Sequence, residues 1–132
     1  MTANLNNVEK YIDCCIINGS HYDVSLACVE ILKEQYKYVG NNTWKYLKDN
    51  DWHTDDKQMN LKFAIRTIVC NAFIQRSLFW DLKSTHATDM NIAIDDKFRA
   101  NRLLTISSKL KEDKYISTII KESKQFFTNE PV

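Results

Sequence analysis

The chain has 132 residues and a mass of 15.5 kDa. That length favours one domain, because two cores of about 65 residues would each bury too little surface for comfortable stability. Hydrophobic residues make up 44% of the chain and charged residues 27%, which excludes a disordered protein, and two glycines with one proline argue against a turn-rich β-sandwich. No apolar run approaches the roughly 18 residues of a membrane span, and charges at Glu9, Lys10 and Asp13 interrupt any signal peptide. We therefore expect an intracellular protein with no membrane partner.

The first part of the chain, residues 1–35, has helical periodicity. Apolar residues recur at intervals of three and four and predict a helix over 4–18, which Gly19 ends. Ser20 stands three residues before Asp23, a variant of the capping box, and predicts the start of a second helix over 21–35.

In residues 36–53 the apolar period changes from helical to alternating. Two strand-like runs, 36–39 and 43–47, flank Gly40-Asn41-Asn42, whose residues tolerate the positive φ of a hairpin turn. A second turn at 49–51 precedes Trp52, which begins a possible third strand. We expect one small antiparallel β-hairpin or three-stranded sheet, whose aromatic face needs helices or a partner to cover it.

Residues 61–127 return to the helical period. One long helix is predicted over 61–82, with Ile65 and Ile68 on its buried stripe. Another is predicted over 91–110, and Asp113 is placed to cap the last helix. The inward stripe predicted for the 91–110 helix consists of Ile94, Phe98, Leu103 or Leu104, and Ser107. The fold class expected is α+β and mostly helical, with about five helices in a single domain over 1–132.

Charge is distributed unevenly along the chain. Residues 1–60 hold six Lys and nine acids (6 − 9 = −3), and residues 61–132 hold twelve bases and eight acids (12 − 8 = +4). A basic stretch of this kind can follow a phosphate backbone, although a solvated helix face gives the same pattern. The candidate phosphate contacts in the second half are Arg99, Arg102, Lys109, Lys111, Lys114, Lys121 and Lys124.

The hairpin adds aromatic candidates to these basic ones. Trp44 and Trp52, with Lys45 and Lys48 between them, can stack the bases of a single strand while the lysines contact phosphates. The alternative is that both indoles are core contacts of the hairpin, because strand aromatics usually bury large areas.

Catalytic and metal-binding motifs are not apparent in the sequence. Two glycines cannot supply a phosphate-binding loop, and no nucleophile or metalloprotease signature is present. The four cysteines lack a Cys-x-x-Cys pair, and a zinc site would have to gather Cys14 or Cys15, Cys28 and a histidine from irregular spacings. We expect no catalysis by this chain alone, no metal site and no cofactor.

The order of these features resembles a known family. The run from Tyr36 to Val39, the run Asn42-Thr43-Trp44-Lys45-Tyr46-Leu47 with its second tryptophan at Trp52, and the closing segment over 99–127 are similar to the helicase N-terminal domain of poxvirus-type and satellite-phage primase-helicases. The resemblance covers 22–127. The sequence departs from the family pattern at Lys45, Leu47 and Asp51, where an aromatic residue, Phe and His are usual.

The resemblance implies a non-catalytic domain of a viral or mobile-element DNA replication protein, which helps to organise a helicase ring and contacts DNA. ATP and Mg would act only if a helicase domain follows in the full-length protein. The implied partners are DNA and helicase or primase domains, or a second copy through self-association, in the host cytoplasm or nucleus. The alternative is a stand-alone interaction module that docks a replication partner without binding nucleic acid.

Overall fold

The computed structural model describes residues 5–128. Three strands form one antiparallel sheet, β1 (Tyr36–Tyr38), β2 (Trp44–Lys48) and β3 (Asp51–Thr54). The α-helical segments are α1 (Leu5–Asp13), α2 (His21–Leu32), α3 (Met59–Ala64), α4 (Cys70–His86), α5 (Met90–Lys109) and α6 (Asp113–Phe127). A π turn, η2 (Ile65–Val69), joins α3 to α4 in one continuous helix over 59–86. The described residues therefore form five helices and a small sheet, which confirms the predicted α+β class.

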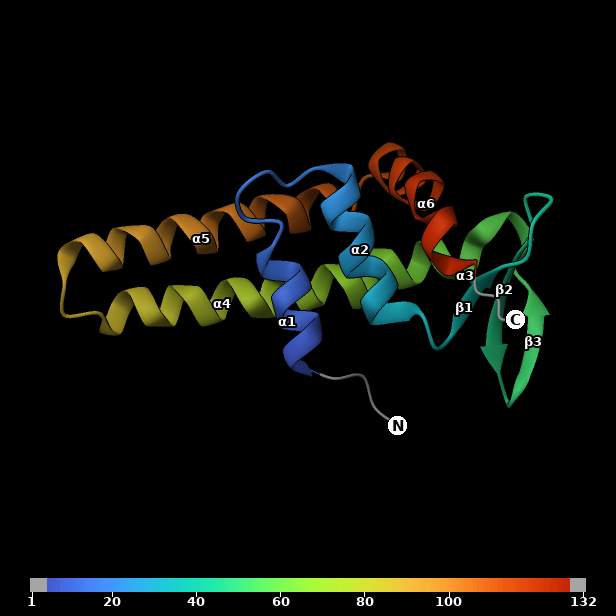
Figure 1. The fold of residues 1–132 in the computed structure, drawn as a ribbon, viewed down its shortest axis with the longest axis horizontal. Coiled ribbons are helices and arrows are strands. Elements are labelled where there is room, and N and C mark those ends of the chain that lie inside the picture. Colours follow the sequence, from blue (N-terminus) through green and yellow to red (C-terminus); the bar gives the residue numbers. More distant parts are fainter. Residues whose placement is uncertain (1–4, 129–132) are drawn as a thin grey trace.

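The molecule is elongated. Figure 1 shows α4 and α5 side by side along the long axis, with their connecting loop at one end, beyond α1. The sheet lies at the opposite end, next to α3 and the last turn of α6. The main core lies between these ends, where α2 packs on α6 and large side chains such as Phe73, Leu103 and Ile116 are fully buried.

The first two helices are shorter than the sequence predicts. After Asp13 the backbone tightens, because the N–H groups of Cys15 and Ile16 donate to carbonyls three residues back. Gly19 has a φ of +59°, and a Cβ there would lie 3.2 Å from the carbonyl oxygen of Cys15, so glycine is required at this turn. The predicted cap of α2 is present, since the N–H of Asp23 donates to Ser20 Oγ over 3.1 Å.

The long helix starts and ends outside its predicted limits and contains the π turn. The extra residue of a π turn rotates the helix face that follows it. Ile68, which lies inside the π turn and was predicted to be buried, is exposed, while Ile65 and Val69 are buried. The start of α3 is held by Asp55, whose buried carboxylate accepts the backbone N–H groups of Asn60 and Leu61.

The inward face predicted for α5 is confirmed at Leu103 and Ser107 and is wrong at Ile94 and Phe98. Ile94, Phe98 and Leu104 are exposed, and the buried residues are Asp96, Ala100, Leu103, Ile106 and Ser107. The prediction at the start of α6 also needs correction. Glu112 occupies the N-cap position without a side-chain bond, and Asp113 is the first helical residue, paired with Arg66.

Candidate nucleic-acid interface

The sheet has two faces that are fixed by the register of its strands. Lys48 pairs with Asp51 across a two-residue turn in which Asp49 and Asn50 have φ values of 54° and 67°. Positive φ at both turn residues matches the right-handed twist of the strands and locks the pairing. Because side chains alternate along a strand, residues that are direct cross-strand partners share a face.

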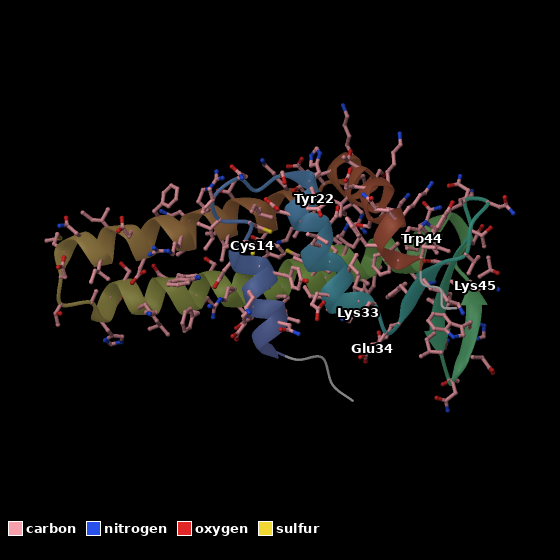
Figure 2. The ribbon with its side chains drawn as sticks, in the orientation of Figure 1. Cys14, Tyr22, Lys33, Glu34, Trp44 and Lys45 are labelled. Carbon is pink, nitrogen blue, oxygen red and sulfur yellow. The ribbon has the colours of Figure 1, made fainter. Side chains whose placement is uncertain are left out.

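The inner face of the sheet is part of the core. Trp44 is 1% exposed, and its ring centroid lies 5.2 Å from that of Tyr38 and 5.2 Å from that of Phe127 on α6. Its indole Nε1 is buried without a hydrogen-bond partner among the described residues. Figure 2 shows Trp44 where the sheet meets α6. Trp44 therefore serves as a core contact and is not accessible for stacking on a base.

The outer face carries the second tryptophan and two lysines. Lys37 pairs with Lys45, Lys45 pairs with Thr54, and Leu47 pairs with Trp52, so these side chains project from the side opposite Trp44. Trp52 is 37% exposed, and Lys37 Nζ lies 4.3 Å from the centroid of its ring. An indole, a cation against its face and a second cation one row away form a compact platform, which we call the outer sheet face.

Two positive charges sit directly opposite each other on this outer sheet face. Like charges at paired positions of an antiparallel sheet destabilise it, and Lys37 and Lys45 are such a pair. No carboxylate among the described residues forms an ion pair with either of them. An anion bound between the two ammonium groups would relieve the repulsion.

Three of the predicted phosphate contacts are used inside the protein. Arg99 donates to the buried carboxylate of Asp96 over 2.8 Å and lies against the Trp80 ring. Arg102 donates to the carbonyl oxygens of Ile16 and Ile17, which follow α1.

Lys124 likewise has an internal role. Its Nζ donates to Asn42 Oδ1 over 2.8 Å and lies 5.2 Å from the centroid of the Tyr38 ring. This contact ties α6 to the β1–β2 turn.

The remaining basic candidates are exposed but scattered. Lys48 lies on the Trp44 side of the sheet, at the end of the central strand β2 and paired with Asp51. Lys114 and Lys121 are seven residues apart and share one side of α6. Lys109 and Lys111 lie at and just beyond the end of α5.

Sequence reasoning missed Lys37 as a site residue. Its signal is present in the alternation, since Lys37 and Lys45 both stand between aromatic residues that point inward. Pairing the two lysines required the register, which the five-residue connection over 39–43 does not reveal by itself.

The cysteines divide into one exposed thiol and three buried ones. Burial raises the pKa of the Cys28 thiol to about 12, and burial together with the charge of Asp23 raises the pKa of Cys15. Cys14 is exposed on the turn that follows α1, as Figure 2 shows. Among residues 5–128 no three His, Cys, Asp or Glu side chains come together as a metal-ligand group.

No helix within the described part of the chain is long and apolar enough to cross a membrane. In comparisons with known proteins, no family model and no curated protein sequence matches the chain.

Proposed function

We propose that this chain is a non-catalytic domain that binds single-stranded DNA through the outer sheet face. The observation that carries the proposal is the pairing of Lys37 with Lys45 beside the exposed ring of Trp52. Non-specific binding of single strands combines aromatic rings that stack bases with cations that contact the backbone. The outer sheet face supplies both groups on neighbouring rows.

The wider assignment, to a primase-helicase of viral or mobile-element type, rests on the sequence resemblance. The segments that carry the resemblance lie together, because Trp44 of the hairpin packs on Phe127 and Lys124 bonds to Asn42. This packing supports treating them as one unit. The proposal assigns no reaction to this chain, and ATP with Mg would belong to a helicase domain if one follows.

The test is the affinity for a fluorescently labelled oligothymidylate, measured by anisotropy over a series of salt concentrations. Lys37→Ala combined with Lys45→Ala should weaken binding at low salt. It should also reduce the slope of log K against log salt by roughly 1.4, because each phosphate contact to a single strand contributes about 0.7. Trp52→Ala should weaken binding by roughly 5- to 150-fold, because the loss of one stacked base costs about 1–3 kcal/mol.

Lys48→Ala is the matched control, because it removes the same charge from the other face of the same sheet. It should leave affinity and salt slope unchanged. A different outcome would assign the site to the junction of α5 and α6. In that case reversing the charges of Lys109, Lys111 and Lys114 abolishes binding, while the outer-face variants bind normally. Absence of binding by the unaltered protein at low salt would refute the nucleic-acid function.

A second function, docking of a protein partner, is favoured by a different surface. The hairpin of α4 and α5 exposes large apolar side chains at its free end, including Leu82, Met90 and Ile94. Exposed large apolar side chains mark interaction sites where they join into one patch.

A further inference from the structure

The helical hairpin of α4 and α5 is closed by small residues. Cys70 Sγ, Ser77 Oγ and Ser84 Oγ donate to the carbonyl oxygens of Ser107, Ala100 and Ala93 respectively, over 3.3, 2.8 and 2.7 Å. Both sets of residues are spaced by seven, so one seam runs along the hairpin. Because small side chains fill this seam, the large apolar residues nearby lie outside it.

One side of the hairpin is already covered by the rest of the molecule. Arg76 of α4 binds the Asp13 carboxylate through two bonds of 3.0 and 2.7 Å, and Trp80 donates to the same carboxylate. Arg102 of α5 binds the carbonyls of Ile16 and Ile17. These contacts identify the side of the hairpin that faces α1 and the turn after it.

On the opposite side of the hairpin, large apolar side chains are left exposed by the described residues 5–128. With 3.6 residues per turn, Leu78 and Leu82 lie about 100° and 140° around α4 from Ser77, away from Arg76 and Trp80. The ion pair between Asp81 and Lys97 bridges the two helices on this same side. We call this surface the hairpin back face, and its exposed apolar residues are Leu78, Leu82, Met90, Ile94 and Leu104.

The charges of the hairpin back face are balanced. Within it, Asp81 on α4 and Lys97 on α5 are paired with each other, and the exposed apolar residues lie on the same two helices. A two-fold axis near this pair would set Asp81 of each copy against Lys97 of the other. A surface of this kind is self-complementary, as an isologous interface requires.

The size of the apolar patch suits a weak dimer. Full burial of a Leu, Ile or Met removes about 60–120 Å² of apolar surface, so covering five side chains that are about half to three-quarters exposed removes roughly 170–350 Å² per copy. Because apolar atoms contribute about 60% of an interface, the total for two copies is roughly 600–1,200 Å², around the lower limit for specific association.

We propose that the hairpin back face binds the same face of a second copy of this chain, forming a two-fold symmetric bundle of four helices. Two antiparallel hairpins packed face to face have the geometry of a four-helix bundle. The interface leaves the outer sheet face free, since the sheet lies at the opposite end of the molecule (Figure 1). The proposal is independent of the nucleic-acid function.

Sedimentation velocity on the unaltered chain tests the proposal. The mass should rise from 15.5 kDa toward twice that value across a concentration series that spans a dissociation constant on the order of micromolar. A constant mass of 15.5 kDa would refute it, and another occupant would then have to cover the face.

Charge variants identify the face. Asp81→Lys gives a back face with two positive charges, and Lys97→Asp gives one with two negative charges, so each should self-associate at least tenfold more weakly. An equimolar mixture of the two should recover the double mass, because the opposite faces then attract. Dimers that persist in each separate variant, or a mixture that stays monomeric, would overturn the assignment of the face.

A matched pair of apolar variants separates this face from the remainder of the hairpin. Leu82→Glu on the hairpin back face should abolish association. Ile92→Glu, which alters a similarly exposed residue lining a hollow with Lys83 on the other side, should leave it intact. Circular dichroism melts of both variants check folding, and equal effects of the two on association would contradict the proposal.

Discussion

Ser77 Oγ donates a hydrogen bond of 2.8 Å to the carbonyl oxygen of Ala100, across the middle of the α4–α5 seam. Both residues are buried, and Ala100 has no side chain beyond Cβ to hold the helices apart. The hydroxyl of Ser77 therefore donates to a carbonyl oxygen that lies within helix α5. Close backbone approach along this seam thus contributes to holding the hairpin together, beside the buried apolar residues of both helices.

Ser77→Leu should therefore be much more damaging than Ser77→Ala. The alanine variant loses one hydrogen bond and should cost about 1 kcal/mol of unfolding free energy. The leucine variant forces three extra carbons into the seam and should cost about 3 kcal/mol, because overpacked cores shift their backbone. Urea denaturation measures both. Leucine tolerated as well as alanine would show that the seam has spare volume.

Asp55 should be among the most sensitive polar residues of the chain. Its side chain is 3% exposed and accepts the N–H groups of Asn60 and Leu61 over 2.8 and 2.9 Å. Asp55→Ala leaves two donors at the start of α3 without their partner and should cost about 2–3 kcal/mol in urea denaturation. The neighbouring Asp56→Ala is the control, because Asp56 is exposed, and a similar loss there would argue against the capping role of Asp55.

Local signals in the sequence were sufficient for the element types. Ser20 with Asp23 marked the start of α2, and the paired turn residues Asp49 and Asn50 marked the second hairpin of the sheet. Each signal acts within four residues, where the sequence and the bond it makes are close together.

Which side a residue occupies depended on partners that the sequence does not name. The stripe predicted for α5 assumed that Ile94 and Phe98 face inward, but small residues line the seam with α4, so these two large side chains are exposed. The heptad spacing of Ser77 and Ser84 was visible in the sequence. The role of these serines in joining α4 to α5 depends on carbonyl groups that α5 presents at the same spacing.

The candidate site was only partly predictable, because it too depends on contacts between distant segments. Alternation along β2 puts Trp44 and Lys45 on opposite faces of the sheet. The face that carries Trp52 depends on the β2–β3 register, which the sequence does not reveal. The partner of Arg102, the carbonyl of Ile16, is 86 residues away and becomes a neighbour only through folding, whereas the i,i+3 pairing of Arg99 with Asp96 follows from the helix itself.

The two hairpin tryptophans should respond in opposite ways to the same substitution. Trp44→Leu removes a fully buried ring from contact with Tyr38 and Phe127 and should cost about 3 kcal/mol of unfolding free energy. Trp52→Leu alters an exposed side chain and should change stability by less than about 1 kcal/mol. Thermal melts give both values, and a Trp52 variant as unstable as the Trp44 one would show that both rings belong to the core.

Stability should fall as the pH rises from about 9 to 12. Burial raises the pKa of Cys28 from 9.0 to about 12 and that of Tyr115 from 10.0 to about 12, so the folded chain keeps protons that the unfolded chain releases. Because the unfolded state then binds fewer protons, the free energy of unfolding decreases with pH over this window and is unaffected below it. Urea midpoints measured between about pH 8 and 11 record the slope.

Tyr115→Phe isolates the tyrosine contribution to this slope. The variant keeps the ring and removes the ionisable hydroxyl, so its stability should fall less steeply than that of the unaltered chain above about pH 10, where a free tyrosine begins to ionise. Tyr22→Phe, at an exposed position, is the control and should leave the slope unchanged. Identical slopes for the unaltered chain and the Tyr115 variant would mean that the buried thiols alone cause the alkaline loss of stability.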